Sequence, residues 1–183
     1  MKTTERLLAA VKDIWAGYNS QPFVLGIQEG CLPVEKFRYY IIQDYLYLQD
    51  YARTFALGAA KAKSLETARL FTGYLQALTG EEMDIHRGYM GRLGLSPEEL
   101  EQTPRGLASL SYTSYMLRIA YEEGETEILA AVLSCALSYE FIAKKMLEDQ
   151  PLAAEQPFYG DWVRGYVSES YGEENRRLSQ ALD

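Results

Sequence analysis

The spacing of apolar residues along the chain predicts helices almost throughout. In residues 5–19 apolar side chains recur at intervals of three and four, as on one face of an amphipathic helix. The same spacing predicts further helices over residues 22–30, 34–60, 65–92, 105–122, 125–148 and 158–171. No stretch shows the sustained alternation of apolar and polar residues that marks a strand. We therefore predict an all-α fold, a bundle of about seven helices.

Proline and glycine separate the predicted helices. Ser96-Pro97-Glu98-Glu99 has the residues of a helix start, with a capping serine, a proline in the first turn and an acid at the third position. The helix over residues 125–148 is apolar on two sides, so we expect it to be central and buried. The chain contains no internal repeat, low-complexity segment or interdomain linker. These features predict a single domain over residues 1–183.

Composition narrows the possible partners. The chain has 183 residues, of which 48% are hydrophobic and 24% charged, the profile of a soluble globular protein. A formal charge of −8 argues against partners that are nucleic acids or anionic membranes. The apolar runs are short and broken by polar residues, so we expect no transmembrane helix. The N-terminus shows no signal peptide, which points to the cytoplasm.

Cysteine and histidine are scarce, which limits the chemistry available. The two cysteines, Cys31 and Cys135, are too few for a disulfide scaffold and form no CxxC pair. His86 is the only histidine, so a site with several histidine ligands within one chain is excluded. We therefore expect no metal or haem cofactor. The 15 tyrosines suit either an ordinary aromatic core or a pocket for a flat polar ring.

Asp44 is the first candidate site residue. It stands among apolar and aromatic residues, and a buried carboxylate needs a partner. Tyr40, Tyr47 and Tyr51 lie at −4, +3 and +7 from it, on the same face of the predicted helix. Such a carboxylate could grip a polar heteroaromatic ligand. Alternatively, Asp44 is a structural residue that accepts hydrogen bonds from a tyrosine or from Arg53.

Cys135 and His86 are the other candidates. A buried cysteine is commonly a small hydrophobe, but Cys135 has Tyr139 one turn further on and lies in an unusually polar helix centre. A thiol is also a capable nucleophile. His86 follows Glu82 by four residues, a spacing that could ligate a metal but more simply fits a solvated acidic turn with His86 anchoring a hydrogen bond.

The order of these residues resembles the TenA (thiaminase II) family. The resemblance begins with Pro22-Phe23, Leu32-Pro33, Gln43-Asp44-Tyr45, Tyr47-Leu48 and Arg53. It continues through Glu82 and His86, Ser111-Tyr112, Cys135 with Tyr139, and Tyr159-Gly160-Asp161-Trp162, and so covers nearly the whole chain. The resemblance implies a haem-oxygenase-like helical bundle, a homotetramer, and hydrolysis of aminopyrimidines or thiamin in thiamin salvage.

The resemblance also implies roles for individual residues. Cys135 matches the nucleophile, and Asp44 the carboxylate that binds the amino edge of the pyrimidine. Tyr47, Tyr112 and Tyr139 match aromatic or hydrogen-bonding positions of the substrate pocket. The implied mechanism is addition of the Cys135 thiolate to a ring carbon, departure of the aminomethyl amine or the thiazole, and replacement of the leaving group by water.

The chain departs from the family in two places. Gln21 stands where the family often has a histidine, a minor change. The last helix of the family, with its catalytic glutamate, has no counterpart in the sequence near Asp183, so we assign no residue to that role. The missing glutamate keeps one alternative open, a non-catalytic protein that binds aminopyrimidine or thiamin. A third function, a metal-dependent oxygenase of the same fold, would need His86 as a haem ligand or more histidines than one for a dinuclear site.

Overall fold

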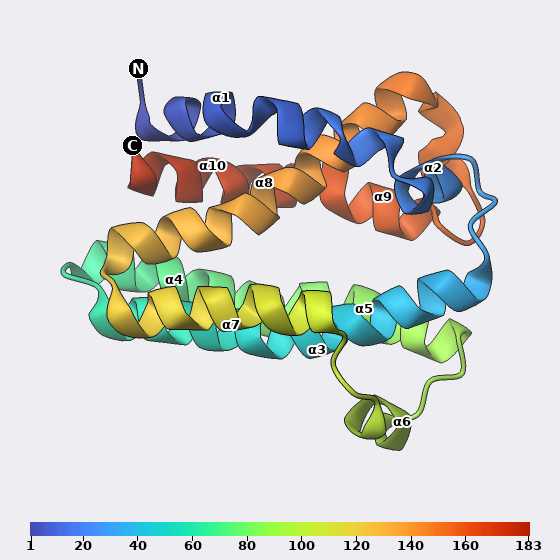
Figure 1. The fold of residues 1–183 in the computed structure, drawn as a ribbon, viewed down its shortest axis with the longest axis horizontal. Coiled ribbons are helices and arrows are strands. Elements are labelled where there is room, and N and C mark those ends of the chain that lie inside the picture. The colour runs from blue at the N-terminus through green and yellow to red at the C-terminus, as the bar shows by residue number, and fades with distance from the viewer. The chain divides into compact units, whose positions relative to one another are not determined.

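The computed structural model describes the backbone of residues 1–183 and every side chain except those of residues 81, 82, 84 and 85. Its regular secondary structure is helical, and the described backbone contains no strand, which confirms the all-α prediction. The α-helices are α1 (Thr3–Ala16), α2 (Pro22–Gln28), α3 (Val34–Lys61), α4 (Leu65–Ala77), α5 (Met83–Arg92), α6 (Pro97–Gln102), α7 (Leu107–Glu122), α8 (Glu125–Asp149), α9 (Gly160–Val167) and α10 (Glu169–Leu182). Figure 1 shows them in chain order.

The chain divides into two compact units. One unit consists of Met1–Pro33 with Leu133–Asp183, and the other of Val34–Val132. We call them the terminal unit and the middle unit. Helix α8 belongs to the middle unit up to Val132 and to the terminal unit from Leu133 onward. The single domain expected over residues 1–183 stays a prediction.

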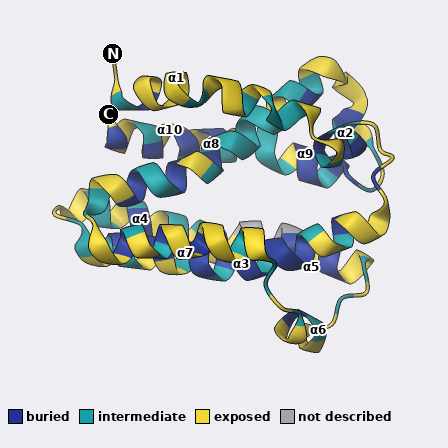
Figure 2. Ribbon diagram, in the orientation of Figure 1, coloured by how far each residue is buried: buried dark blue, intermediate teal, exposed yellow. Residues whose placement is uncertain are grey.

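In the middle unit, α4 and α7 both pack on α3 (Figure 1). Helix α3 is the longest helix and carries many of the buried residues of this unit (Figure 2). Phe37, Phe55 and Phe71 are each at most 1% exposed. A Cβ atom on Gly58 would lie 2.4 Å from a ring carbon of Phe71, so this close approach of α3 and α4 requires a glycine.

In the terminal unit, side chains fasten distant segments to one another. The Tyr159 hydroxyl donates to the Leu32 carbonyl at 2.5 Å. At the two ends of the chain, the Thr4 amide donates to Asp183 Oδ1 at 2.9 Å, so α1 begins beside the end of α10 (Figure 1). These contacts join segments more than 100 residues apart in the sequence, since 127 and 179 positions separate the two pairs.

The helix boundaries differ from the predictions in two places. The helix expected over residues 65–92 is interrupted by a π-helical turn at Leu78–Glu82, where the Thr79 hydroxyl donates to the Leu75 carbonyl at 2.8 Å. Such a side-chain contact competes with the helical backbone and bends helices. The helix expected over 158–171 is α9, which ends at Val167, and a further helix, α10, follows it. The prediction of about seven helices was therefore too low.

The expectation of no transmembrane helix has one exception by length and composition, helix α8. By length and composition alone it could cross a membrane, which the sequence analysis did not anticipate. The finding is weak evidence of a membrane span, since the core helix of a soluble protein has the same length and composition. Ile128 and Val132 are fully buried, and Leu129 and Leu133 are 3% exposed.

Candidate functional site

Asp44 and His86 form a buried pair in the middle unit. Asp44 is 8% and His86 4% exposed, and His86 Nε2 lies 2.6 Å from Asp44 Oδ2. A carboxylate oxygen accepts hydrogen bonds, so Nε2 carries the hydrogen in this contact. The pairing joins α3 to α5 over 42 positions of sequence. Both residues were candidates from the sequence, but their pairing was not predicted.

Both hydrogen bonds that Asp44 receives reach the same oxygen. The Tyr40 hydroxyl donates to Oδ2 at 3.3 Å, and His86 donates to the same atom. Oδ1 accepts no hydrogen bond from the described residues. A charge held on one side by the protein in this way can accept hydrogen bonds from a polar ligand on the other.

Tyrosine rings extend from Asp44 along the same face of α3. The rings of Tyr47 and Tyr51 are stacked with centroids 5.2 Å apart. Tyr112 of α7 lies parallel to Tyr47, with a centroid distance of 5.7 Å and an interplanar angle of 3°. The structure thus brings together three of the predicted site residues, Asp44, Tyr47 and Tyr112, in the middle unit.

The hydroxyls of Tyr47 and Tyr51 have partners other than Asp44. The Tyr51 hydroxyl donates to the Val132 carbonyl at 2.9 Å, and the Tyr47 hydroxyl lies 3.9 Å from Met116 Sδ. Of the three tyrosines expected around Asp44, Tyr40 is the one whose hydroxyl reaches the carboxylate. Of the three tyrosines predicted to share a helix face with Asp44, one therefore bonds to its carboxylate.

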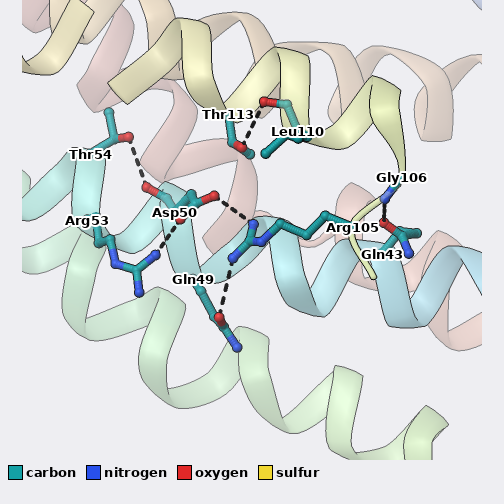
Figure 3. Close-up of polar contacts among 9 residues, drawn as sticks. All are labelled: Gln43, Gln49, Asp50, Arg53, Thr54, Arg105, Gly106, Leu110 and Thr113. Carbon is teal, nitrogen blue, oxygen red and sulfur yellow. Dashed lines mark hydrogen bonds and ion pairs between the residues drawn. The ribbon is translucent and has the colours of Figure 1, made fainter. Parts of the chain in front are cut away.

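Arg53 pairs with Asp50 and not with Asp44 (Figure 3). The structural alternative for Asp44 named a tyrosine or Arg53 as the donor, and the tyrosine, Tyr40, is the one that the structure shows. Arg53 Nη1 donates to Asp50 Oδ1, and Arg105 Nη1 donates to Asp50 Oδ2 at 2.6 Å. Asp50 is 6% exposed, and the two guanidinium groups compensate its charge. The signal for this cluster in the sequence is a second acid in an apolar stretch of the same helix.

Cys135 and Tyr139 lie one turn apart on α8 in the terminal unit. Neither Cys135 nor Cys31 forms a disulfide in the described structure, and Cys135 is half-buried while Cys31 is exposed. Tyr139 belongs to an aromatic cluster with Trp162 and Tyr166 of α9, at centroid distances of 6.0 and 4.6 Å. The structure therefore places the predicted nucleophile one turn from this cluster.

Two side chains of α10 bond to the turn of α8 that carries Cys135. The Tyr171 hydroxyl and Asn175 Nδ2 both donate to the Ala136 carbonyl, at 3.1 and 3.2 Å. Asn175 is 2% exposed and also donates to Glu140 Oε2 at 2.6 Å. Since Ala136 follows Cys135 directly, α10 helps to fix the backbone at the predicted nucleophile. These residues were not anticipated, because α10 was not among the predicted helices.

The Glu82 side chain, whose spacing to His86 could also have suited a metal, lies outside the described residues. Within the described part of the chain, no group of three or more histidine, cysteine, aspartate or glutamate residues could hold a metal ion. The observed partner of His86 is the carboxylate of Asp44. This agrees with the simpler interpretation that His86 anchors a hydrogen bond.

Comparison with known proteins gives a consistent result. The sequence model of the TENA/THI-4/PQQC family matches residues 8–183. An aminopyrimidine aminohydrolase from Halalkalibacterium halodurans is 45% identical over 184 aligned residues, which cover all of this chain and 81% of that protein. An aminopyrimidine aminohydrolase from Helicobacter pylori is 43% identical, with 93% of this chain and 78% of that protein covered.

Solved structures of the same family have the same fold. A TenA family transcription regulator from Silicibacter sp. TM1040 superposes with a TM-score of 0.91 at 30% identity, covering 100% of this chain and 79% of that one. A TenA homologue from P. horikoshii OT3 gives a TM-score of 0.89 at 30% identity, with 100% of this chain and 85% of that one covered. Together with the matched family model and the identity to curated relatives, these similarities show that the chain belongs to the TENA/THI-4/PQQC family.

Proposed function

We propose that this protein hydrolyses aminopyrimidines such as 4-amino-5-aminomethyl-2-methylpyrimidine, and thiamin, in thiamin salvage. Relatives that are 45% and 43% identical over nearly the whole chain are named aminopyrimidine aminohydrolases, which favours an enzyme over a non-catalytic binding protein. The structural observation that carries the proposal is the buried carboxylate of Asp44, held through one oxygen by His86 and Tyr40.

Asp44 is the proposed ligand of the pyrimidine's polar edge. An aminopyrimidine presents an amino group beside a ring nitrogen, and a carboxylate can accept a hydrogen bond from the first and share a proton with the second. Protonation of the ring nitrogen draws electrons from the ring carbons and makes them better electrophiles. His86 and Tyr40 hold Oδ2, which leaves Oδ1 for the ligand.

Cys135 is the proposed nucleophile. Its thiolate adds to a ring carbon, and the π electron pair of the C=N double bond at that carbon moves onto the ring nitrogen that Asp44 protonates, so the ring stays closed. The ring then expels the exocyclic leaving group, which is ammonia from the aminomethyl compound or the thiazole from thiamin. Water adds to the exocyclic carbon, the C–S bond breaks, and the thiolate is regenerated. Only water is consumed, and the reaction is a hydrolysis without redox change.

Tyr47, Tyr112 and Tyr139 are the proposed aromatic contacts of the substrate. The parallel pair of Tyr47 and Tyr112 offers ring faces and hydroxyls to a flat heterocycle. Tyr139, one turn from Cys135, belongs to the cluster with Trp162 and Tyr166. No residue is assigned to the proton transfer that the family performs with its C-terminal glutamate.

Incubation of the purified protein with the aminomethylpyrimidine, and separately with thiamin, tests the proposed function. Chromatography should detect the hydroxymethylpyrimidine as the product of both reactions, and the relative kcat/KM identifies the preferred substrate. Absence of this product from both reactions, with a folded protein that binds the pyrimidine, would favour the non-catalytic alternative.

We also propose that the protein is a cytoplasmic homotetramer. The family resemblance supports the assembly, and so do the exposed apolar side chains of α7. The large exposed apolar side chains on this helix are Leu107, Leu110, Tyr112, Tyr115 and Tyr121. Several exposed apolar residues close together on one helix are typical of surfaces that contact another protein chain.

A further inference from the structure

The loop that precedes α7 is fastened to α3 by polar contacts (Figure 3). Gln43 Oε1 accepts the Gly106 amide at 2.7 Å, and Gln43 Nε2 donates to the Pro104 carbonyl at 3.1 Å. Two turns further along α3, Asp50 Oδ2 accepts Arg105 Nη1 at 2.6 Å. Three consecutive loop residues are therefore attached to α3, and the last of them, Gly106, is the N-cap of α7.

The groups on α3 that hold this loop are buried. Asp50 is 6% and Gln43 9% exposed. Loss of Arg105 would leave the buried Asp50 with Arg53 alone, and such losses cost more than those of an exposed ion pair. A Cβ atom on Gly106 would lie 2.7 Å from the Tyr39 hydroxyl, so the backbone itself comes close to α3 at this point.

The same stretch of α3 carries the stacking partner of Tyr112. Tyr47 lies on α3 between Gln43 and Asp50, four residues after the first and three before the second, so the three side chains share a face. Tyr112 lies six residues after Gly106 on α7, with its ring parallel to that of Tyr47. Because an α-helix advances 1.5 Å and turns about 100° per residue, the point where α7 begins determines where Tyr112 points.

We propose that Arg105 and Gln43 are positioning residues that hold the start of α7 on α3 and thereby set Tyr112 parallel to Tyr47. Asp50 is the anchor for Arg105. The inference rests on the proposed function, because it assigns to these residues the orientation of the aromatic pair that contacts the pyrimidine. Neither Arg105 nor Gln43 is assigned a contact with the substrate.

The far end of α7 provides a matched control. There Lys61 Nζ donates to the carbonyls of Tyr121 and Glu123 at 2.7 and 2.8 Å. Like the contact of Arg105 with Asp50, this contact uses a basic side chain to hold α3 and α7 together. However, Tyr121 lies nine residues beyond Tyr112 along α7. We call the contacts of Arg105 and Gln43 at the start of α7 the clamp. Substitution of Lys61 or of Arg105 should weaken α3–α7 packing in general, whereas only loss of the clamp should misplace Tyr112.

The test compares Arg105→Gln and Lys61→Gln in the full chain, with 3-fluorotyrosine incorporated at position 112 as a 19F NMR probe. We expect only Arg105→Gln to shift the 19F signal and to lower kcat/KM for the aminomethylpyrimidine, by about 10- to 100-fold. Arg105→Lys, which keeps the cation, should recover part of both effects. An unchanged 19F signal in folded Arg105→Gln protein would overturn the proposal, as would an equal shift in Lys61→Gln.

A double-mutant cycle shows whether Arg105 acts through Tyr112. If it does, Arg105→Gln combined with Tyr112→Ala should lower kcat/KM little further than Tyr112→Ala alone, while additive losses would contradict the proposal. Should Arg105→Gln not fold, Gln43→Ala must give the same 19F shift and the same non-additivity. If the wild type does not turn over the pyrimidine, the proposed function fails, and the 19F comparison still decides whether the clamp positions Tyr112.

Discussion

Substitution of Asp44 by asparagine shows whether this carboxylate binds the pyrimidine or only stabilises the fold. Asparagine has nearly the same shape and keeps a carbonyl oxygen that can accept from His86 Nε2, which lies 2.6 Å from Oδ2 in the wild type. The substitution removes the charge and half of the acceptor capacity. If Oδ1 binds the amino edge of the pyrimidine, the loss should appear in ligand affinity.

The expected sizes of the two effects differ. A hydrogen bond to a charged group contributes about 1.5–3 kcal/mol, so Asp44→Asn should raise the Kd for the pyrimidine by about 10- to 150-fold. Within the protein, a charged hydrogen bond from His86 becomes a neutral one, which lowers the free energy of unfolding by about 1 kcal/mol. For a protein of this size, that corresponds to a decrease in Tm of about 2–4 °C.

Titration calorimetry with the aminomethylpyrimidine and thermal unfolding measure the two effects on the same preparation. Glu99→Gln is the control, since Glu99 forms an ion pair with Arg38 at 2.5 Å in the same unit. This control should leave the Kd unchanged. If Asp44→Asn binds the pyrimidine normally and only the Tm falls, the carboxylate is structural and the proposed role of Asp44 is wrong.

Three further predictions concern His86, metals and assembly. His86→Phe should leave Asp44 without the donor 2.6 Å from Oδ2 and weaken pyrimidine binding by at least several-fold, because the carboxylate is no longer held in place; calorimetry that gives the wild-type Kd would refute this. Treatment with a chelator should leave kcat unchanged, and elemental analysis should find no stoichiometric metal; one equivalent of a metal whose removal abolishes activity would contradict it. Light scattering should give a tetramer, and Tyr115→Glu, at a position 54% exposed on α7, should reduce its population; a wild-type monomer at micromolar concentration would rule out the proposed assembly.

The periodic pattern of apolar residues predicted most of the helices. The start of α6 followed from Ser96-Pro97, and the structure confirms the cap, because the Glu99 amide donates to the Ser96 hydroxyl at 3.2 Å. The pattern did not reveal the π-helical turn at Leu78–Glu82, because this segment, Leu-Thr-Gly-Glu-Glu, has a single large apolar side chain and so defines no apolar face. It also missed the boundary at Ser168, whose hydroxyl accepts the Tyr171 amide and so caps α10.

The candidate site was predictable in its residue types but not in its pairings. Asp44 stood out as an acid among apolar residues, and His86 as the only histidine. Their hydrogen bond depends on how α5 approaches α3, and a helical period contains no information about which helices become neighbours. For the same reason, the ion pair between Asp50 and Arg105, which lies on the loop before α7, was not anticipated.

Release of ammonia from 4-amino-5-aminomethyl-2-methylpyrimidine tests the central claim most directly, measured side by side for the wild type, Cys135→Ser and Cys31→Ser. Wild type and Cys31→Ser should release one ammonia for each hydroxymethylpyrimidine formed, since Cys31 is exposed and has no assigned role. Cys135→Ser should bind the pyrimidine with a similar Kd and release no ammonia, because a serine hydroxyl ionises far less readily than a thiol. Wild-type turnover by Cys135→Ser would contradict covalent catalysis through this residue.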